Sequence, residues 1–128
     1  MKDISEASAP AKVQTEMFEA DLQAQCVRWY KGRSDDAWAR KFSSISQRSV
    51  PDYLFSTHTN KGFKIIKNKF ACEFKRPGHK IDKETGVMST KAQVEEQEAM
   101  RLAGWFVFEC DNFEKFKATV MAYEAEQA

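Results

Sequence analysis

The chain has 128 residues and a net charge of +1, which suits one domain around one hydrophobic core and excludes a strongly acidic or basic protein. With 42% hydrophobic and 30% charged residues it is not a disordered chain, and no apolar stretch approaches the roughly 20 residues that span a bilayer. The N-terminus lacks the apolar segment of a signal peptide, so we expect a cytoplasmic protein with no membrane partner.

The first part of the chain predicts one helix between two irregular stretches. Residues 1–14 are polar, with alanine, serine and proline, and predict a flexible tail. Apolar residues at helical spacing predict a helix over 16–31, which Gly32 can end. Residues 33–49 are polar and predict irregular chain, with at most one helical turn around Trp38.

Three strands are expected next, over residues 52–56, 63–66 and 69–75, with a turn over 57–62 between the first two. A charged loop then leads to the second helix.

The second helix is predicted over 91–103. Thr90 and Gln93 have the spacing of a capping box, and Gly104 is a natural C-terminal stop. An apolar strand over 105–109 and a last helix over 111–124 complete the chain. The order α-β-β-β-α-β-α predicts an α/β domain over residues 15–128, with a mixed β-sheet flanked by helices.

The few cysteines and histidines give no metal-binding pattern. Cys26, Cys72 and Cys110 are widely spaced among apolar residues, and they should behave as small buried hydrophobes. His58 and His79 have no second ligand at a suitable spacing, so we expect no structural zinc.

The basic residues are concentrated in one segment. Residues 61–91 carry nine basic and three acidic side chains, whereas residues 92–128 carry three basic and eight acidic ones. Such a segment suggests a surface that binds a polyanion, and a solvated lysine-rich hairpin is an equally open interpretation. The residues proposed to bind DNA are Lys64, Lys67, Lys69, Arg76, Lys80 and Lys91.

A Pro-Asp pair and a Glu-x-Lys triplet lie on two of the predicted strands. Side chains alternate along a strand, so Glu73 and Lys75 share one face. If the two strands pair, Asp52 meets Glu73, and two adjacent carboxylates favour a cation such as Mg²⁺ or Mn²⁺. The backbone carbonyl of Phe74 is a further candidate metal ligand.

These groups would suit phosphodiester hydrolysis. A bound metal lowers the pKa of a water molecule, and Lys75 can offset the charge that grows on the phosphate. Glu19 on the first helix and Gln93 on the second are supporting candidates. We expect Glu73 and Lys75 to be accessible to solvent, so that replacing them leaves folding intact.

Simpler interpretations stay open for each residue. Asp52 could merely begin a strand, and Glu73 with Lys75 could be an exposed same-face pair. Gln93 could be only a helix cap, and Glu19 only a solvent-facing helix residue.

The whole pattern resembles the VRR-NUC branch of the PD-(D/E)XK nuclease superfamily. The matching motifs are Glu19-x-x-Leu22-Gln23, Pro51-Asp52, Glu73-Phe74-Lys75 and Ala92-Gln93. This resemblance implies a restriction-endonuclease-like core with Asp52 and Glu73 as metal ligands, Lys75 as the catalytic lysine, and Glu19 and Gln93 as supporting residues. Stand-alone members resemble Holliday junction resolvases, act as homodimers on branched DNA, and often come from phages or bacteria. A phage protein would work in the host cytoplasm.

The leading hypothesis is therefore a metal-dependent DNA endonuclease, a phosphodiester hydrolase that selects branched DNA. A second is a catalytically silent nuclease fold that binds DNA or a protein partner. A third is an unrelated small binding module in which the two motifs coincide by chance, with the carboxylates far apart.

Overall fold

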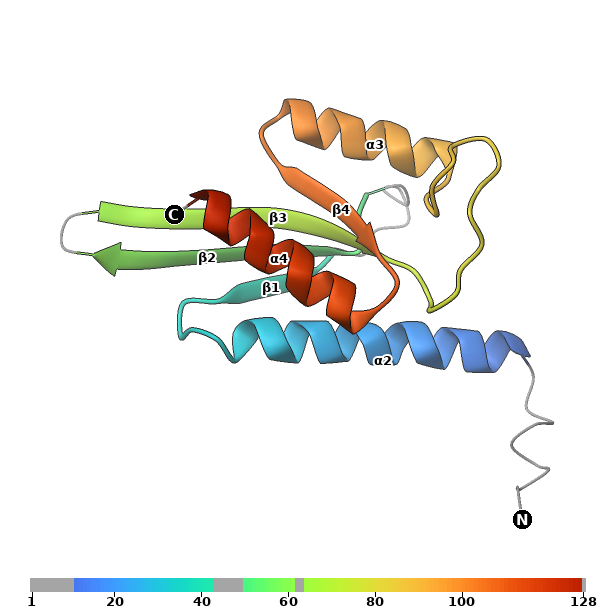
Figure 1. Ribbon diagram of the computed structural model, residues 1–128, viewed down its shortest axis with the longest axis horizontal. Helices are drawn as coiled ribbons and strands as arrows, with labels where there is room; N and C mark the ends of the chain where they lie inside the picture. The colour runs from blue at the N-terminus through green and yellow to red at the C-terminus, as the bar shows by residue number, and fades with distance from the viewer. Residues whose placement is uncertain (1–10, 43–49, 62–63, 128) are drawn as a thin grey trace, which may run out of the picture.

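The computed structural model describes residues 11–42, 50–61 and 64–127, and these form three helices and four strands in the predicted order (Figure 1). The elements are α2 (Ala11–Lys31), β1 (Trp38–Lys41), β2 (Tyr53–Lys61), β3 (Lys64–Phe74), α3 (Lys91–Leu102), β4 (Phe106–Cys110) and α4 (Phe113–Gln127). The mixed α/β class predicted from the sequence is confirmed.

The four strands form one mixed sheet in the order β1-β2-β3-β4. Strand β2 pairs antiparallel with β1 and with β3. Strands β3 and β4 are parallel and are joined by the crossover through α3. The start of β2, the end of β3 and the start of α3 consequently lie at the same end of the molecule, on the right in Figure 1.

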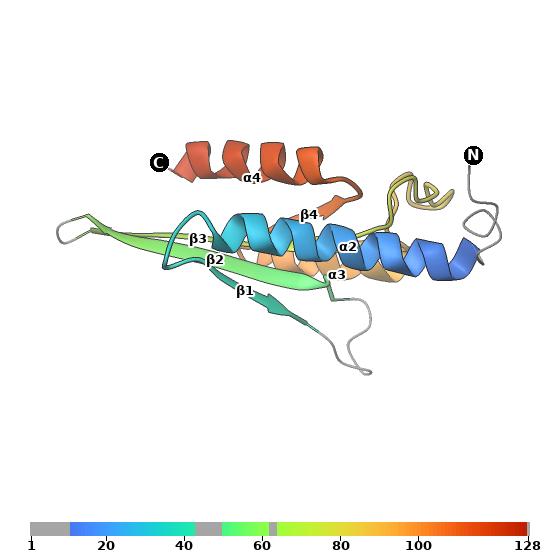
Figure 2. The ribbon, with the colours of Figure 1, turned by 90° about the horizontal axis from the view of Figure 1, so that it is seen from below.

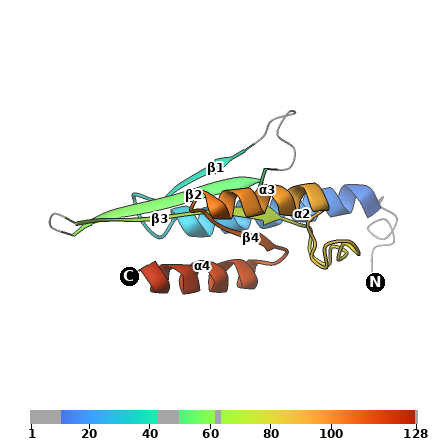
Figure 3. The same ribbon diagram turned by 90° about the horizontal axis from the view of Figure 1, so that it is seen from above.

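Helices lie on both sides of this sheet. Figures 2 and 3 show α4 on one side of β4 and α3 on the other. Helix α2 contacts α4 as well as β1 and β3, so α2 and α4 together enclose the hydrophobic core against the sheet. No helix among the described residues is long and apolar enough to cross a membrane.

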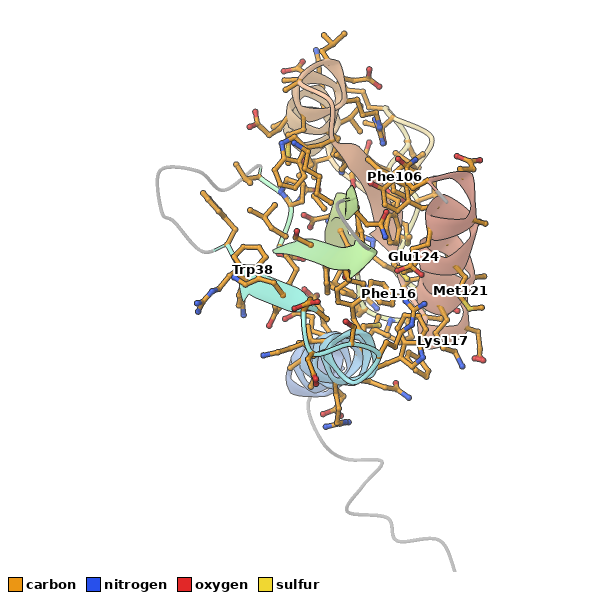
Figure 4. The ribbon with its side chains drawn as sticks, turned by 90° about the vertical axis from the view of Figure 1, so that its left-hand side faces the viewer. Trp38, Phe106, Phe116, Lys117, Met121 and Glu124 are labelled. Atoms are coloured by element: carbon orange, nitrogen blue, oxygen red, sulfur yellow. The ribbon has the colours of Figure 1, made fainter. Side chains whose placement is uncertain are left out.

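The core is built from aromatic rings and thiols on one face of the sheet. Phe70, Cys72 and Phe74 alternate along β3 toward α2 and α4, as strand geometry requires. Phe55 on β2 stacks on Phe70 with ring centroids 4.8 Å apart. Phe116 of α4 completes the layer, and Figure 4 shows it on the α4 side of the sheet. As predicted, the three cysteines are unpaired and buried in this core.

Several predicted boundaries are wrong. Helix α2 begins at Ala11 instead of residue 16, so residues 11–14 of the predicted tail are helical, and residues 1–10 lie outside the described part. The predicted strands over 63–66 and 69–75 are the single strand β3, since Asn68 continues the strand opposite Thr57 instead of breaking it.

The stretch before β2 holds a strand that the sequence did not predict. Trp38 begins β1 instead of lying in a helical turn, because Trp38–Lys41 pairs with β2 as the edge of the sheet. The predicted turn over 57–62 is also mostly strand, since β2 continues to Lys61. Tertiary pairing has overridden weak local preference in both places.

The helix ends are closer to prediction. The Thr90 capping box of α3 is present in both directions, and Gly104 adopts the positive φ of 97° that glycine tolerates after a helix. Helix α4 is capped by Asn112, whose Oδ1 accepts from the N–H of Lys115 at 2.7 Å, and it starts two residues later than predicted.

The core position of Phe116 gives a stability prediction. Phe116→Ala should lower the free energy of unfolding by about 3–5 kcal/mol, because it removes a fully buried ring that contacts several others. Met121→Ala is the matched control on the exposed side of the same helix and should cost less than about 0.5 kcal/mol. Urea titrations of both variants measure the difference, and equal losses would contradict this packing.

Candidate active site

The register of β2 and β3 brings Asp52 beside Glu73. Tyr53 pairs with Cys72, so Asp52 and Glu73 face each other one residue further along the two antiparallel chains. The N–H of Phe74 donates to Oδ2 of Asp52 at 2.9 Å, which fixes this carboxylate against the end of β3. The proximity expected from the two motifs is therefore present, and the carboxylates do not lie far apart.

Gln93 joins the two charged residues of the Glu-x-Lys triplet. Its Nε2 donates to Oε2 of Glu73 at 3.2 Å, and its Oε1 accepts from Nζ of Lys75 at 2.9 Å. Nζ of Lys75 also lies 3.5 Å from Oε2 of Glu73. Because Gln93 also closes the capping box, with the N–H of Thr90 donating to Oε1 at 2.8 Å, it is a helix cap and a site residue together.

Glu109 of β4 holds the start of α3 where Gln93 needs it. Its two carboxylate oxygens accept from the N–H groups of Met88, at 2.8 Å, and Ser89, at 3.0 Å. Ser89 is buried and its Oγ accepts from Gln97 at 2.9 Å. The loop before α3 is thus tied to β4 just ahead of the capping box. Sequence reasoning missed Glu109, although a lone charge at the end of an apolar strand was a usable sign.

The site is buried, contrary to expectation. Glu73 is 4% exposed and Lys75 8%, and Gln93 at the start of α3 contacts both of them. Burial and the charge of Asp52 raise the pKa of Glu73 to about 8. Burial likewise raises the pKa of Asp52, against the lowering effect of the Phe74 N–H and of Lys75. Replacing either member of the Glu73–Lys75 pair should therefore affect stability as well as chemistry.

Glu19 of α2 lies at the border of this group. Burial and the nearby charge of Asp52 raise the pKa of the Glu19 carboxyl, and Lys75 opposes that rise. The Nε2 of Gln23 lies 3.5 Å from Oε1 of Glu19, one helical turn away. Lys41, at the end of β1, lowers the pKa of both Asp52 and Glu19, and the sequence prediction missed it because β1 was not recognised.

The predicted DNA-binding residues come from β3, from the loop that follows it and from the start of α3. Lys64 and Lys67 lie on β3, but their side chains are outside the described part of the structure. Lys69 is exposed over the ring of Trp105, and Arg76 follows β3. The last two predicted residues are the exposed Lys80, in the loop after β3, and Lys91, which pairs with Glu84 at 3.8 Å.

The donor set fits a magnesium-type ion better than zinc. In the part of the chain that the structure describes, no three His, Cys, Asp or Glu side chains form a metal-binding group. Magnesium needs only one or two protein carboxylates and keeps several waters, which Asp52 and Glu73 satisfy. Burial, and after it the charge of Asp52, raises the pKa of Glu73, and a divalent cation beside the two carboxylates would oppose that rise.

Comparisons with known proteins identify no family. No protein-family model matches the chain, and no curated protein matches its sequence. The roles of Asp52, Glu73, Lys75 and Gln93 must therefore be argued from their geometry.

The protonation of Glu73 predicts how stability depends on pH. Between its ordinary value of 4.5 and about 8, Glu73 holds a proton in the folded chain but not in the unfolded one. Without divalent ions, the free energy of unfolding should therefore fall as pH rises through this interval. Glu73→Gln should flatten that fall, and urea titrations of both proteins at several pH values measure it. Parallel profiles would contradict the assignment.

The anchor at Glu109 gives a second prediction. Glu109→Gln should lower the free energy of unfolding by about 1–3 kcal/mol, because the glutamine amide has one acceptor oxygen where the carboxylate has two. One of the two backbone N–H groups would then lose its acceptor. Hydrogen exchange should accelerate at the amides of Met88 and Ser89. Glu95→Gln, an exposed change on α3, is the control and should leave both measurements unchanged. Unaltered exchange in Glu109→Gln would argue against the anchor.

Proposed function

We propose that this protein is a metal-dependent DNA endonuclease with a restriction-endonuclease-like core, similar to the VRR-NUC branch of the PD-(D/E)XK superfamily. The observation that carries the proposal is the meeting of Asp52, Glu73 and Lys75 at one end of the sheet, joined by Gln93. The order of helices and strands and the parallel pairing of β3 with β4 are compatible with it.

Asp52 and Glu73 would hold the metal ion. Their carboxylates lie on adjacent strands, and the backbone of Phe74, whose N–H bonds Asp52, runs between them and offers its carbonyl as a third oxygen. Bound there, Mg²⁺ or Mn²⁺ would supply Lewis acidity toward a phosphate oxygen and lower the pKa of a water molecule.

Lys75 supplies a positioned positive charge. Two acceptors, Oε1 of Gln93 and Oε2 of Glu73, fix its ammonium group, and the fixed orientation lets it stabilise negative charge without reorganising. Gln93 contacts both Glu73 and Lys75, and its own place is set by the capping box. Glu19 adds a carboxylate at the border, where it can accept a hydrogen bond from a water molecule.

The test is cleavage of four-way, flap, nicked and linear DNA with Mg²⁺ or Mn²⁺. Wild type should cut, most readily on branched DNA, and excess EDTA should stop it. Glu73→Gln should lower the rate at least about hundredfold, since it removes an anionic ligand while keeping the bond to Gln93 in an isosteric side chain.

Melting curves separate loss of chemistry from loss of fold. Glu73→Gln should melt at or above the wild-type temperature near pH 8, because the buried carboxylate is gone. Glu95→Gln is the matched control and should cut normally. Cleavage unchanged in EDTA or in Glu73→Gln would refute the site, and DNA binding without any cleavage would favour the silent nuclease fold.

A two-fold homodimer belongs to the same proposal. One site cuts one strand, so symmetric incision of a branched substrate needs two related sites. Among the aromatic residues, Tyr30 and Phe70 are buried in the core, whereas Trp38 is 42% exposed and could lie at an interface. We expect light scattering to give the mass of a dimer at micromolar concentration; a monomer that cuts symmetrically would contradict this.

A further inference from the structure

Four residues form a straight row across the sheet face that points away from the core. Trp38 of β1 pairs with Ser56 of β2, and Ser56 pairs with Lys69 of β3. Trp105 stands next to Lys69, since Phe70 pairs with Phe106 in the parallel ladder. We call these four residues the tryptophan row. Its two ends are about 14 Å apart, from three strand spacings of about 4.8 Å.

Trp38 and Lys69 of the row are exposed, Ser56 and Trp105 are partly buried, and two cations lie beside the two indole rings. Trp38 is 42% exposed, and Figure 4 shows it on the side of the sheet away from α4 and Phe116. Nζ of Lys69 lies 5.2 Å from the ring centre of Trp105, and the guanidinium of Arg40 lies 5.9 Å from that of Trp38. Within the described residues, neither cation has an acidic ion-pair partner.

The row lies on the same sheet face as the candidate active site. Lys69 and Glu73 are four residues apart on β3, so their side chains share a face about 13 Å apart along the strand. The exposed Arg40 projects on that face from β1 between the row and Asp52, because it pairs with Leu54.

Charge and shape point to one occupant. Two indole rings, each with a cation within 6 Å of its centre, suit a strand whose bases are free to stack and whose phosphates need neutralising. The bases of a duplex are already stacked and cannot use such rings. Asp35 and Asp36 border Trp38 in a shallow pocket with Ser56, and they would keep phosphates on the Lys69 and Arg40 side.

We infer that the tryptophan row binds a single-stranded segment of DNA, with bases on Trp38 and Trp105 and phosphates at Lys69 and Arg40. The inference deepens the proposed function and rests on it, because the bound strand would be an unpaired arm of a branched substrate lying beside Asp52 and Glu73. The binding itself does not depend on cleavage.

The experiment measures binding without metal, so that cleavage cannot interfere. A fluorescent oligothymidine of about 20 nucleotides is titrated with protein in EDTA, with a blunt duplex of equal length as competitor. Wild type should bind the single strand more tightly than the duplex. Trp38→Ala and Trp105→Ala should each weaken single-strand binding at least about fivefold, while Trp38→Phe keeps most of it.

Three further variants keep the test decisive if Trp105→Ala is poorly folded. Lys69→Gln changes an exposed side chain and should reduce the salt dependence of binding. Met121→Ala removes an exposed apolar side chain from α4 and should bind like wild type. Asp35→Asn with Asp36→Asn should strengthen binding.

Several results would overturn the inference: no binding of oligothymidine by wild type, equal binding by Trp38→Ala, or a parallel loss for the duplex. Self-association that Trp38→Ala abolishes, with single-strand binding intact, would assign the row to a second copy of the chain. The experiments can refute the nuclease proposal and the tryptophan-row proposal independently. Binding through Trp38 without cleavage refutes only the nuclease, whereas cleavage with normal binding by Trp38→Ala refutes only the row.

Discussion

The two-sided character of β3 is the constraint on which the rest of the molecule depends. Phe70, Cys72 and Phe74 enter the core, so the residues between them, including Glu73, must face the opposite side. A shift of one residue in the pairing with β2 would bring Glu73 into the aromatic core and Phe74 into the polar site. The register that builds the core is therefore the same register that sets Asp52 opposite Glu73.

A buried charged group of this kind needs support from outside its own strands. Strand pairing alone brings two carboxylates together, and their mutual repulsion is then not balanced by a positive charge. Lys75 supplies one charge, and Gln93 satisfies both Glu73 and Lys75 while also capping its helix. Glu109 holds that helix start to β4. The site thus depends on four elements, β2, β3, α3 and β4, and none of them could form it alone.

The sequence predicted the grouping of Asp52, Glu73 and Lys75 better than the elements around it. Asp52, Glu73 and Lys75 could be found because a two-residue alternation and strand pairing decide their faces. The role of Gln93 could be narrowed only to two alternatives, and the structure shows that both hold. Strand β1 could not be predicted, because its four residues have no strong alternation and its stability comes from pairing with β2. The burial of Glu73 and Lys75 depends on tertiary contacts such as those of Gln93, which local sequence does not specify.

The crossover through α3 also decides when during folding the site comes into existence. The β2–β3 hairpin closes between neighbouring segments and can form early, whereas the β3–β4 pairing must join segments separated by the whole of α3. An intermediate with only the hairpin would hold Asp52 and Glu73 together without Gln93 or the anchor at Glu109. Such a nascent chain would have the acidic pair but not the fixed ammonium group of Lys75. Completion of the last parallel pairing is then the event that brings Gln93 and Glu109 to the acidic pair, so a chain that has not yet paired β4 would lack the assembled group.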